Sequence, residues 1–402
     1  MFRLALRNVF RHKLRTLLTL LAITTGVAAL ILSGGFVQDM FDQLAEATIH
    51  SQLGHLQIYR TGYYERGSRE PEKYLISDID KIKLRAGQVR EIEDIMARLN
   101  FSGLINNGRA DYAIIGEGVE PAPEARLGSS LSIRAGRQLT STDRFGILLG
   151  EGVAKAQNLK PGDRTTLVLN TPQGALNSLD FDVVGVFRSF SKDYDDRAVR
   201  ITLASAQALL DVRGANAIVV SLKKKEDTNP ARTTLNRLLL PEQYDIRAWN
   251  EIADFYKKTI ELYKRQFGVL QIIILAMVVL SVVNSVSMST FERIGEFGTM
   301  MALGDRGTII FRLVMTENIL LGLIGSFIGV VLGLLLALAI SSAGIAMPPP
   351  PNMNQGYIAQ IRLTAYLIGN SFAIGVIATV LAALLPARRV SRIPVIDALR
   401  QN

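Results

Sequence analysis

The 402-residue sequence contains no cysteine and only three histidines. Without cysteine, no disulfide can support the fold and no thiolate can bind a metal. His50 and His55 are five residues apart, which would place them on different faces of a helix, and no cysteine is at hand to complete a ligand set. We therefore expect no metal site, and we expect these histidines to lie at a surface or an interface.

Motifs of several enzyme classes are also missing, because the sequence has no GxSxG, no HExxH and no GxxxxGK[ST]. One GxGxxA pattern, in ILLGEGVAKAQNL, matches the dinucleotide fingerprint superficially. Its helix would be short, a PGD turn follows at once, and no acidic residue ends a second strand about 20 residues on. We expect no catalytic residue and no bound cofactor in this chain. If transport needs ATP, another subunit supplies the site for ATP and Mg²⁺.

Charged residues are absent from four long apolar runs, each longer than the roughly 20 residues that a membrane-spanning helix needs. The runs are Thr16–Val37, Phe267–Thr290, Asn318–Met347 and Leu363–Ala387. We assign transmembrane helices to residues 16–37, 267–290, 313–347 and 363–387. The first run is longer than the apolar core of a signal peptide and no A-x-A site follows it, so we expect it to remain as an anchor.

Basic residues near the helix ends predict the orientation, because short flanks rich in Lys and Arg stay in the cytoplasm. Five basic residues precede the first span, and the tail 388–402 carries four, whereas the loop 348–362 carries only Arg362. Both termini and the segment 291–312 are therefore expected in the cytoplasm, with residues 38–266 on the other side of the membrane. Most of the net charge of +9 then comes from the cytoplasmic flanks of the spans, so we expect no nucleic-acid partner. Residues 1–15 are either an interfacial helix on anionic lipid or an ordinary basic flank.

The segment 38–266 predicts a large α+β domain of two lobes. We expect a mixed α/β lobe from about 38–110 and 222–250, with a helix over DIDKIKLRAGQVREIEDIMARLN. Residues of about 111–221 form short apolar runs bounded by turn residues, which indicates a β-rich lobe. A stalk helix at 250–266 continues into the second span without a breaker.

Small and polar residues mark internal faces of the membrane helices. Gly325, Gly329 and Gly333 stand four apart in the third span and predict a groove for another helix, although glycine is also simply common in membrane helices. In the second span an unpaired polar group in hydrocarbon would be costly, so its polar residues should face protein or water. These residues are Ser281, Asn284, Ser285 and Ser287.

The segment 291–312 carries apolar residues that have little reason to face the cytosol alone. A short helix holds Phe297, Met300 and Met301 and ends at Gly304. Such a helix either docks into another protein or lies among lipid headgroups.

ERIGEFGTMMALG resembles the ERxxEIGxxxALG element of the FtsX/MacB/LolC–LolE permease superfamily, the mechanotransmitting type of ABC transporter, with Phe297 where Ile is usual. The start, ALRNVFRHKLRTLLTLLAITTGVA, and the end, LLPARRVSRIPVIDALR, are similar to the opening and closing patterns of that family. The resemblance implies half-permeases that pair as homo- or heterodimers, each bound to a cytoplasmic ATPase. It assigns ATPase coupling to Glu292, Arg293, Glu296, Phe297 and Met300.

Within the family, the exported segment is similar to that of the lipoprotein-release permeases. LNTPQGALNSLDFDV resembles the hairpin that recruits a periplasmic lipoprotein carrier. Its tip would be Thr171, Pro172, Gln173 and Gly174, for which a plain β-turn remains the alternative. MPPPPNMNQGY, between the last two spans, is an unusual feature for this group.

The leading hypothesis is a permease that extracts a lipoprotein or other lipidic substrate and passes it to a periplasmic carrier or adaptor. A lateral opening between the first two spans would then be lined by Phe36, Met40 and Asn284. One alternative is FtsX-like signalling to an envelope hydrolase. Another is MacB-like export of a drug or peptide with an adaptor.

Overall fold

The structure, a computed structural model, describes residues 7, 11, 13–67, 71–127, 131–239, 242–349, 354, 356–395 and 398. The chain divides into two units, which we call the helical unit and the sheet unit. The helical unit comprises Met1–Asp42, Ile260–Ala346 and Ile358–Asn402; the sheet unit comprises Gln43–Thr259 and Met347–Tyr357. Most of the predicted interfacial helix 1–15, the prolines after Pro349 and the end of the tail 388–402 lie outside the described residues.

Ten strands of the sheet unit form one mixed sheet in the described residues, in the order β10-β1-β9-β2-β3-β8-β5-β7-β4, with β6 paired to β2 and β7. The strands are β1 (Leu56–Arg60), β2 (Ile92–Asn106), β3 (Asp111–Val119), β4 (Ser132–Gly136), β5 (Gly146–Gly150), β6 (Arg164–Asn170), β7 (Leu176–Arg188), β8 (Ala198–Thr202), β9 (Ala217–Leu222) and β10 (Tyr244–Ala248).

Helices connect these strands. They are α3 (Tyr63–Arg66), α4 (Ile79–Ala86), α5 (Pro121–Leu127), α6 (Glu151–Gln157), α7 (Lys192–Asp195), α8 (Leu203–Leu210), α9 (Thr228–Leu238) and α10 (Trp249–Ile252). A π-helical turn (Ile49–Leu53) and 3₁₀ turns at Pro71–Tyr74 and Lys225–Asp227 complete the unit.

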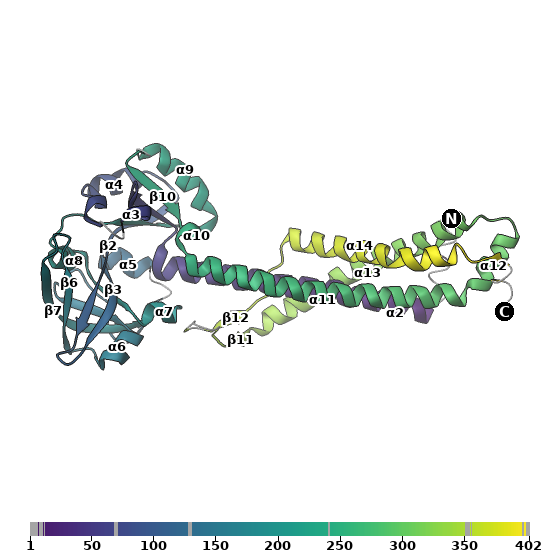
Figure 1. Ribbon diagram of the computed structural model, residues 1–402, viewed down its shortest axis with the longest axis horizontal. Coiled ribbons are helices and arrows are strands. Elements are labelled where there is room, and N and C mark those ends of the chain that lie inside the picture. Colours follow the sequence, from purple (N-terminus) through teal and green to yellow (C-terminus); the bar gives the residue numbers. More distant parts are fainter. Residues whose placement is uncertain are drawn as a thin grey trace. The chain divides into compact units, whose positions relative to one another are not determined.

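Part of the sheet closes on itself, because β2, β3, β8, β5, β7 and β6 pair in a ring that returns to β2. Alternation along the strands turns Leu167, Leu169 and Phe181 inward, where α6 and α8 complete one apolar core. A second core lies where α4 and α9 pack near β1, β9 and β10, around Ile58, Ile218 and Leu235. Figure 1 shows α4 and α9 together, apart from the ring strands β6 and β7.

Two expectations for this unit are wrong. The residues 92–100, expected in a helix, belong to β2, because Met96, Ala97 and Leu99 are buried in the middle of the sheet and tertiary packing overrides helix propensity. The expected lobe boundaries also shift. The C-terminal part of β2 closes the ring with β6, whereas β9 leaves the ring and pairs with β1.

The helical unit contains the four predicted spans as long helices. They are α2 (Lys13–Thr48), α11 (Asp254–Glu292), α13 (Gly307–Ala343) and α14 (Ala365–Val390), with α12 (Ile294–Ala302) between α11 and α13. Each of the four is long and apolar enough to cross a membrane, which confirms the predicted architecture. α2 and α11 continue beyond the predicted spans. The expected stalk helix 250–266 is broken at Ala253, which ends α10, and α11 then runs unbroken from Asp254 into the second span. Two short strands, β11 (Ile345–Met347) and β12 (Tyr357–Ala359), pair between α13 and α14.

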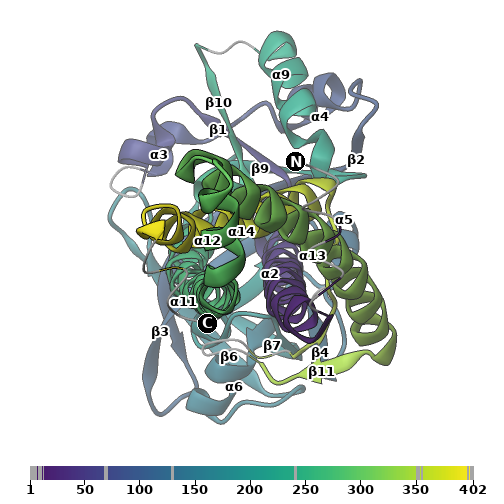
Figure 2. The same ribbon diagram turned by 90° about the vertical axis from the view of Figure 1, so that its right-hand side faces the viewer.

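The glycines of the third span lie against α2. A Cβ added at Gly329 would lie 2.8 Å from the Cβ of Val27, and one at Gly325 would lie 3.0 Å from Ile23. Glycine therefore permits a backbone approach that a larger residue would block. Figure 2 looks along α2 and α11 with α13 and α14 beside them.

Candidate functional site

The turn between α11 and α12 is made by Arg293 alone, at φ −104° and ψ 12°. α12 then ends at Leu303 and Gly304, whose φ of +105° is readily adopted only by glycine. The predicted role of Gly304 as the end of this helix is confirmed.

The inner face of α12 packs against its own chain. The Phe297 side chain is 1% exposed and belongs to the apolar core that α13 and α14 form with Ile310 and Val390. Met300 is half-buried against the same core. A Cβ added at Gly298 would lie 2.8 Å from the Cβ of Ala398. The expectation that Phe297 docks into another protein is therefore wrong, because the helical unit already covers this side chain.

Arg293 is also buried, with 5% of its surface exposed. Its Nη1 and Nη2 donate to the two carboxylate oxygens of Glu317 at 2.8 and 3.3 Å, and its Nε donates to Glu296 at 3.0 Å. The guanidinium carbon lies 4.9 Å from the centre of the Phe297 ring. Arg293 thus contacts its own chain rather than offering its charge outward.

The outer face of α12 and its flanks is exposed. We define this outer face as Phe291, Glu292, Glu296 and Leu303. Leu303 is 84% exposed and Phe291 is 48% exposed. Sequence reasoning missed both of these apolar residues, although an apolar side chain directly before a helix-ending glycine was a signal for Leu303. Two acidic and two apolar side chains are therefore exposed on α12 and its flanks.

A cleft of about 760 Å³ lies between α2 and α11 in the helical unit. It is lined by Lys13, Leu14, Leu18, Ala22, Ser281, Asn284, Ser285, Met288 and Glu292. Leucine and methionine supply apolar walls, while Lys13, Asn284 and Glu292 supply polar groups. We call this the membrane cleft, and it contains three of the four residues expected on a polar internal face.

Phe36 and Met40 lie elsewhere on these helices. The Phe36 ring meets Phe267 edge-on at 6.3 Å, and Met40 is buried. Phe267 and Asn284 are both on α11, and a rise of about 1.5 Å per residue separates them by about 25 Å. The predicted substrate path stays a prediction: Asn284 lines the membrane cleft, whereas Phe36 and Met40 lie further along the same helices.

The predicted partner loop is the turn of the hairpin formed by β6 and β7. Thr171 is buried and its N–H donates to the Ala175 oxygen, while Gly174 adopts φ +85°. Gln173 and Gly174 are exposed at the tip, and Leu176 beside them is 74% exposed. The tip available to a partner is thus smaller than predicted and does not include Thr171.

Four buried charges meet inside the sheet unit. Arg200 Nε donates to Glu117 at 2.9 Å, and Arg98 pairs with Glu124. Arg200 Nη2 also donates to the backbone oxygen of Ser51 at 3.2 Å, in the π-helical turn after α2. The cluster is neutral as a whole and connects β2, β3, β8 and α5 with this turn.

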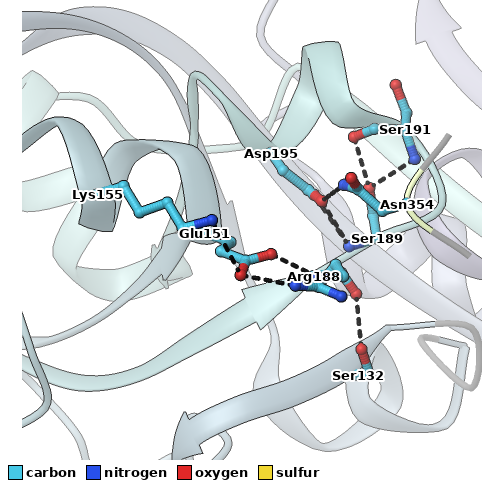
Figure 3. A network of polar contacts seen from close by, with 8 residues as sticks. All are labelled: Ser132, Glu151, Lys155, Arg188, Ser189, Ser191, Asp195 and Asn354. Carbon is cyan, nitrogen blue, oxygen red and sulfur yellow. Dashed lines mark hydrogen bonds and ion pairs between the residues drawn. The ribbon is translucent and has the colours of Figure 1, made fainter. Parts of the chain in front are cut away.

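Figure 3 shows a second network, around Asp195 of α7. Both carboxylate oxygens accept from Ser189 N at 2.9 and 3.0 Å, and Asn354 Nδ2 donates to one of them at 2.5 Å. Asn354 N donates to the Phe190 oxygen at 2.9 Å, so two hydrogen bonds hold Asn354 in place. Burial raises the pKa of Asp195, which the three donated hydrogen bonds oppose.

The neighbouring part of that network joins α6 to β7. Arg188 Nη2 donates to Glu151 at 2.7 Å, Lys155 lies 3.5 Å from the same carboxylate, and Ser132 donates to the Arg188 oxygen. The hydrogen bond from Arg188 holds the pKa of Glu151 below its usual range, although the carboxyl group is partly buried.

His50 and His55 lie side by side in the sheet unit. Among the described residues, no group of three or more His, Cys, Asp or Glu side chains is placed to hold a metal ion. His55 is buried rather than at a surface, and its Nδ1 accepts from Leu222 N at 3.1 Å. His50 lies against it, with ring centres 5.6 Å apart.

Comparison with known proteins adds the family. The model for the MacB-like periplasmic core domain matches residues 16–238, and the model for the FtsX-like permease C-terminal domain matches residues 268–395. The macrolide export ATP-binding/permease protein MacB of Campylobacter jejuni subsp. jejuni serotype O:23/36 (strain 81-176) is 25% identical, over 100% of this chain and 61% of its own length. This chain thus spans about three fifths of that relative.

The lipoprotein-releasing system transmembrane protein LolC of Neisseria meningitidis serogroup B (strain MC58) is 23% identical, over 96% of this chain and 94% of its own length. The periplasmic region of MacB from Actinobacillus actinomycetemcomitans aligns with a TM-score of 0.38 at 19% identity, covering 52% of this chain and 94% of that structure. With a MacB-like core domain and an FtsX-like C-terminal domain joined to four apolar helices, the chain belongs to the MacB/FtsX/LolC family of ABC transporter permeases.

Proposed function

We propose that this chain transmits ATP-driven movement from a separate cytoplasmic ATPase to its sheet unit, across a bacterial inner membrane. Basic flanks of the spans support an orientation with both termini in the cytoplasm and the sheet unit in the periplasm. ATP and Mg²⁺ would bind to the ATPase, and this chain would hold no cofactor.

The outer face of α12 carries this proposal. α12 is fixed to its own chain by Phe297, while Leu303 points away with 84% of its surface exposed. An exposed leucine at the end of α12, in a segment between two membrane helices, is typical of a surface that another protein covers. Glu292 and Glu296 at its edge fit a partner with basic residues at its rim.

Leu303→Asp tests the docking face. In the proposed complex, the substitution replaces an apolar contact that the ATPase covers with a charge. ATPase recovered with the tagged full chain from detergent-solubilised membranes should therefore fall about tenfold or more. Leu84→Asp is the matched control, since Leu84 on α4 is 75% exposed and lies in the sheet unit. Parental recovery with Leu303→Asp, or no ATPase recovered with the parent, would contradict the docking proposal.

We further infer that the substrate is lipidic and enters the membrane cleft. Its walls are apolar, and each methylene of an acyl chain buried there gains about 0.8 kcal/mol. Asn284 supplies a polar contact inside the cleft, whereas Lys13 and Glu292 lie at its cytoplasmic end in the proposed orientation. A periplasmic lipoprotein carrier would then receive the substrate, with the β6–β7 tip as its contact.

Photo-crosslinkers at Leu18 and Met288 test the substrate. Both side chains line the membrane cleft and are exposed, whereas Leu335 on α13 is similarly exposed and is the control. In intact cells the cleft positions should capture a lipidated protein, and Leu335 should not. Capture of phospholipid alone would contradict extraction.

Other captured molecules would favour the alternatives. A drug or peptide would favour export with an adaptor, and a second copy or paralogue would assign the cleft to a dimer interface. If nothing is captured while an envelope hydrolase responds to ATP, signalling replaces transport.

A further inference from the structure

Glu317 is a carboxylate inside α13, one of the four apolar helices, and only 7% of the residue is exposed. An ionisable group in such a helix is costly unless it is paired, and it commonly marks a functional position. Glu317 lies inside the assigned span 313–347, just before the charge-free run that begins at Asn318. The residue that Glu317 contacts indicates its role.

The partner is Arg293, and the contact has the geometry of a planar fork. Two nitrogens of the guanidinium donate to the two Glu317 oxygens at 2.8 and 3.3 Å, while the third nitrogen donates to Glu296 at 3.0 Å. The ring of Phe297 lies under the same group at 4.9 Å. Contacts with α12 and α13 therefore fix the orientation of the guanidinium group.

Because Arg293 lies between two helices, its contact with Glu317 connects three helices. It is the single residue between α11, which ends at Glu292, and α12, which begins at Ile294. One side chain therefore ties the end of α11 and the first turn of α12 to α13. Phe297 also anchors α12, but an apolar contact alone does not fix the rotation of a helix about its axis.

A role in stability alone does not account for the pair. Replacing a buried ion pair by apolar residues of similar size is often neutral or stabilising, because both charges must be desolvated. What apolar residues cannot reproduce is the bidentate geometry. A direct role in ATPase contact is also excluded for Arg293 in this structure, because 95% of its surface is covered by its own chain.

We propose that Arg293 and Glu317 are a positioning pair that fixes the rotation of α12 relative to α13. The outer face is thereby held outward, and a force on it moves α11 and α13 together. This inference rests on the proposed function, in which an ATPase docks on that face. The two residues act through α12 and touch neither nucleotide nor substrate.

Spin-label distances test the positioning without any partner. The chain has no native cysteine, so Thr299→Cys on α12 and Leu323→Cys on α13, both exposed, can be labelled specifically. Arg293→Met combined with Glu317→Leu should broaden the distance distribution between the labels, while circular dichroism and gel filtration stay parental. Arg265→Met combined with Glu261→Leu is the matched control, because it removes an exposed Arg–Glu pair on α11. Parental distances in the folded Arg293–Glu317 double variant would overturn the proposal.

A second variant covers the case in which the double variant does not fold. Arg293→Lys keeps the charge but cannot form the fork, so the folded protein should show a partly broadened distribution. A distribution like that of the parent would overturn the role of the fork.

Membranes that contain the ATPase separate this inference from the proposed function. Because the pair orients the docking face, the double variant should recover less ATPase than the parent, and stimulation of ATP hydrolysis per recovered complex should fall about tenfold, within the usual range of coupling between sites. Full stimulation would overturn the pair's role in force transmission. If even the parent recovers no ATPase, the proposed function fails, and the label distances alone still decide whether the pair positions α12.

Discussion

Individual charged residues inside this protein are paired with residues distant in sequence. Arg200 bonds to Glu117 and to the Ser51 oxygen, and Arg293 bonds to Glu317. A buried charge without such a partner would cost several kcal/mol, so each pair fixes the relative position of the elements that carry it. At the residue scale, these pairs occupy the junctions between elements: the π-helical turn after α2, and the turn before α12.

His55 predicts how the stability of the sheet unit depends on pH. Burial, and then the charges of His50 and Lys225, lower the pKa of His55 to about 4, from about 6.5. The unfolded chain therefore binds a proton between these values when the folded chain does not, so stability falls as the pH drops from about 6.5 to about 4. The loss attributable to His55 is about 3 kcal/mol.

His55→Asn should reduce this loss, because the Asn oxygen can accept from Leu222 N but cannot take up a proton. Chemical denaturation followed between pH 7 and 4 measures it against the parent, and His50→Asn should reduce the loss less, because burial is the larger cause of the lowered pKa of His55. An unchanged pH dependence in the His55 variant would rule out His55 as its source.

The segment 291–312 shows what the sequence could and could not predict. The helix, its position and its glycine end follow from local pattern, and all three are confirmed. The local pattern does not show which apolar residues of this segment face inward. Phe297 and Leu303 are both apolar, and a nine-residue helix has few turns to establish a pattern. Contacts with Ile310 and Val390, distant in sequence, make that choice.

At the scale of elements, the α2–α13 contact depends on glycine. A Cβ at Gly329 would lie 2.8 Å from the Val27 Cβ and 2.9 Å from the Thr24 backbone oxygen, so one of the two helices must shift. At Gly369 on α14, no atom lies within 4 Å of an added Cβ. Because alanine otherwise stabilises a helix by about 0.5–1 kcal/mol relative to glycine, the two positions should respond with opposite signs.

Gly329→Ala should therefore lower the thermal unfolding temperature of the detergent-purified chain, and Gly369→Ala should leave it unchanged or raise it. Equal effects at the two positions would mean that the close approach to α2 does not limit stability.

Elements were predictable where one local pattern decided them. The apolar spans are long enough to leave no alternative, and most strands of the ring alternate or form short apolar runs between turns. β2 was not predictable in this way, because its first half carries charges with helical spacing and its burial follows from β9 and β3 on either side. The closure of the ring by β6 depends likewise on pairing between strands far apart in sequence.

At the scale of the whole molecule, charge is distributed unevenly along the chain. Basic residues exceed acidic ones in the segments that flank the spans, whereas residues 38–266 carry nearly equal numbers of both. Because Lys and Arg in short flanks resist translocation and long domains do not, this distribution specifies one orientation for all four helices at once. The proposed orientation therefore predicts that the sheet unit and the outer face of α12 are reached from opposite sides of the membrane.

Single introduced cysteines test this orientation, because the chain contains no native cysteine that would also be labelled. Leu84→Cys on α4 of the sheet unit should react with a membrane-impermeant maleimide once the outer membrane is opened and the inner membrane is intact. Leu303→Cys beside α12 should react only after the inner membrane is permeabilised. Both side chains are highly exposed, so a difference in labelling reports the side of the membrane rather than burial. Labelling of Leu303→Cys in cells with an intact inner membrane would reverse the topology, and it would place the outer face of α12 beyond the reach of any cytoplasmic ATPase.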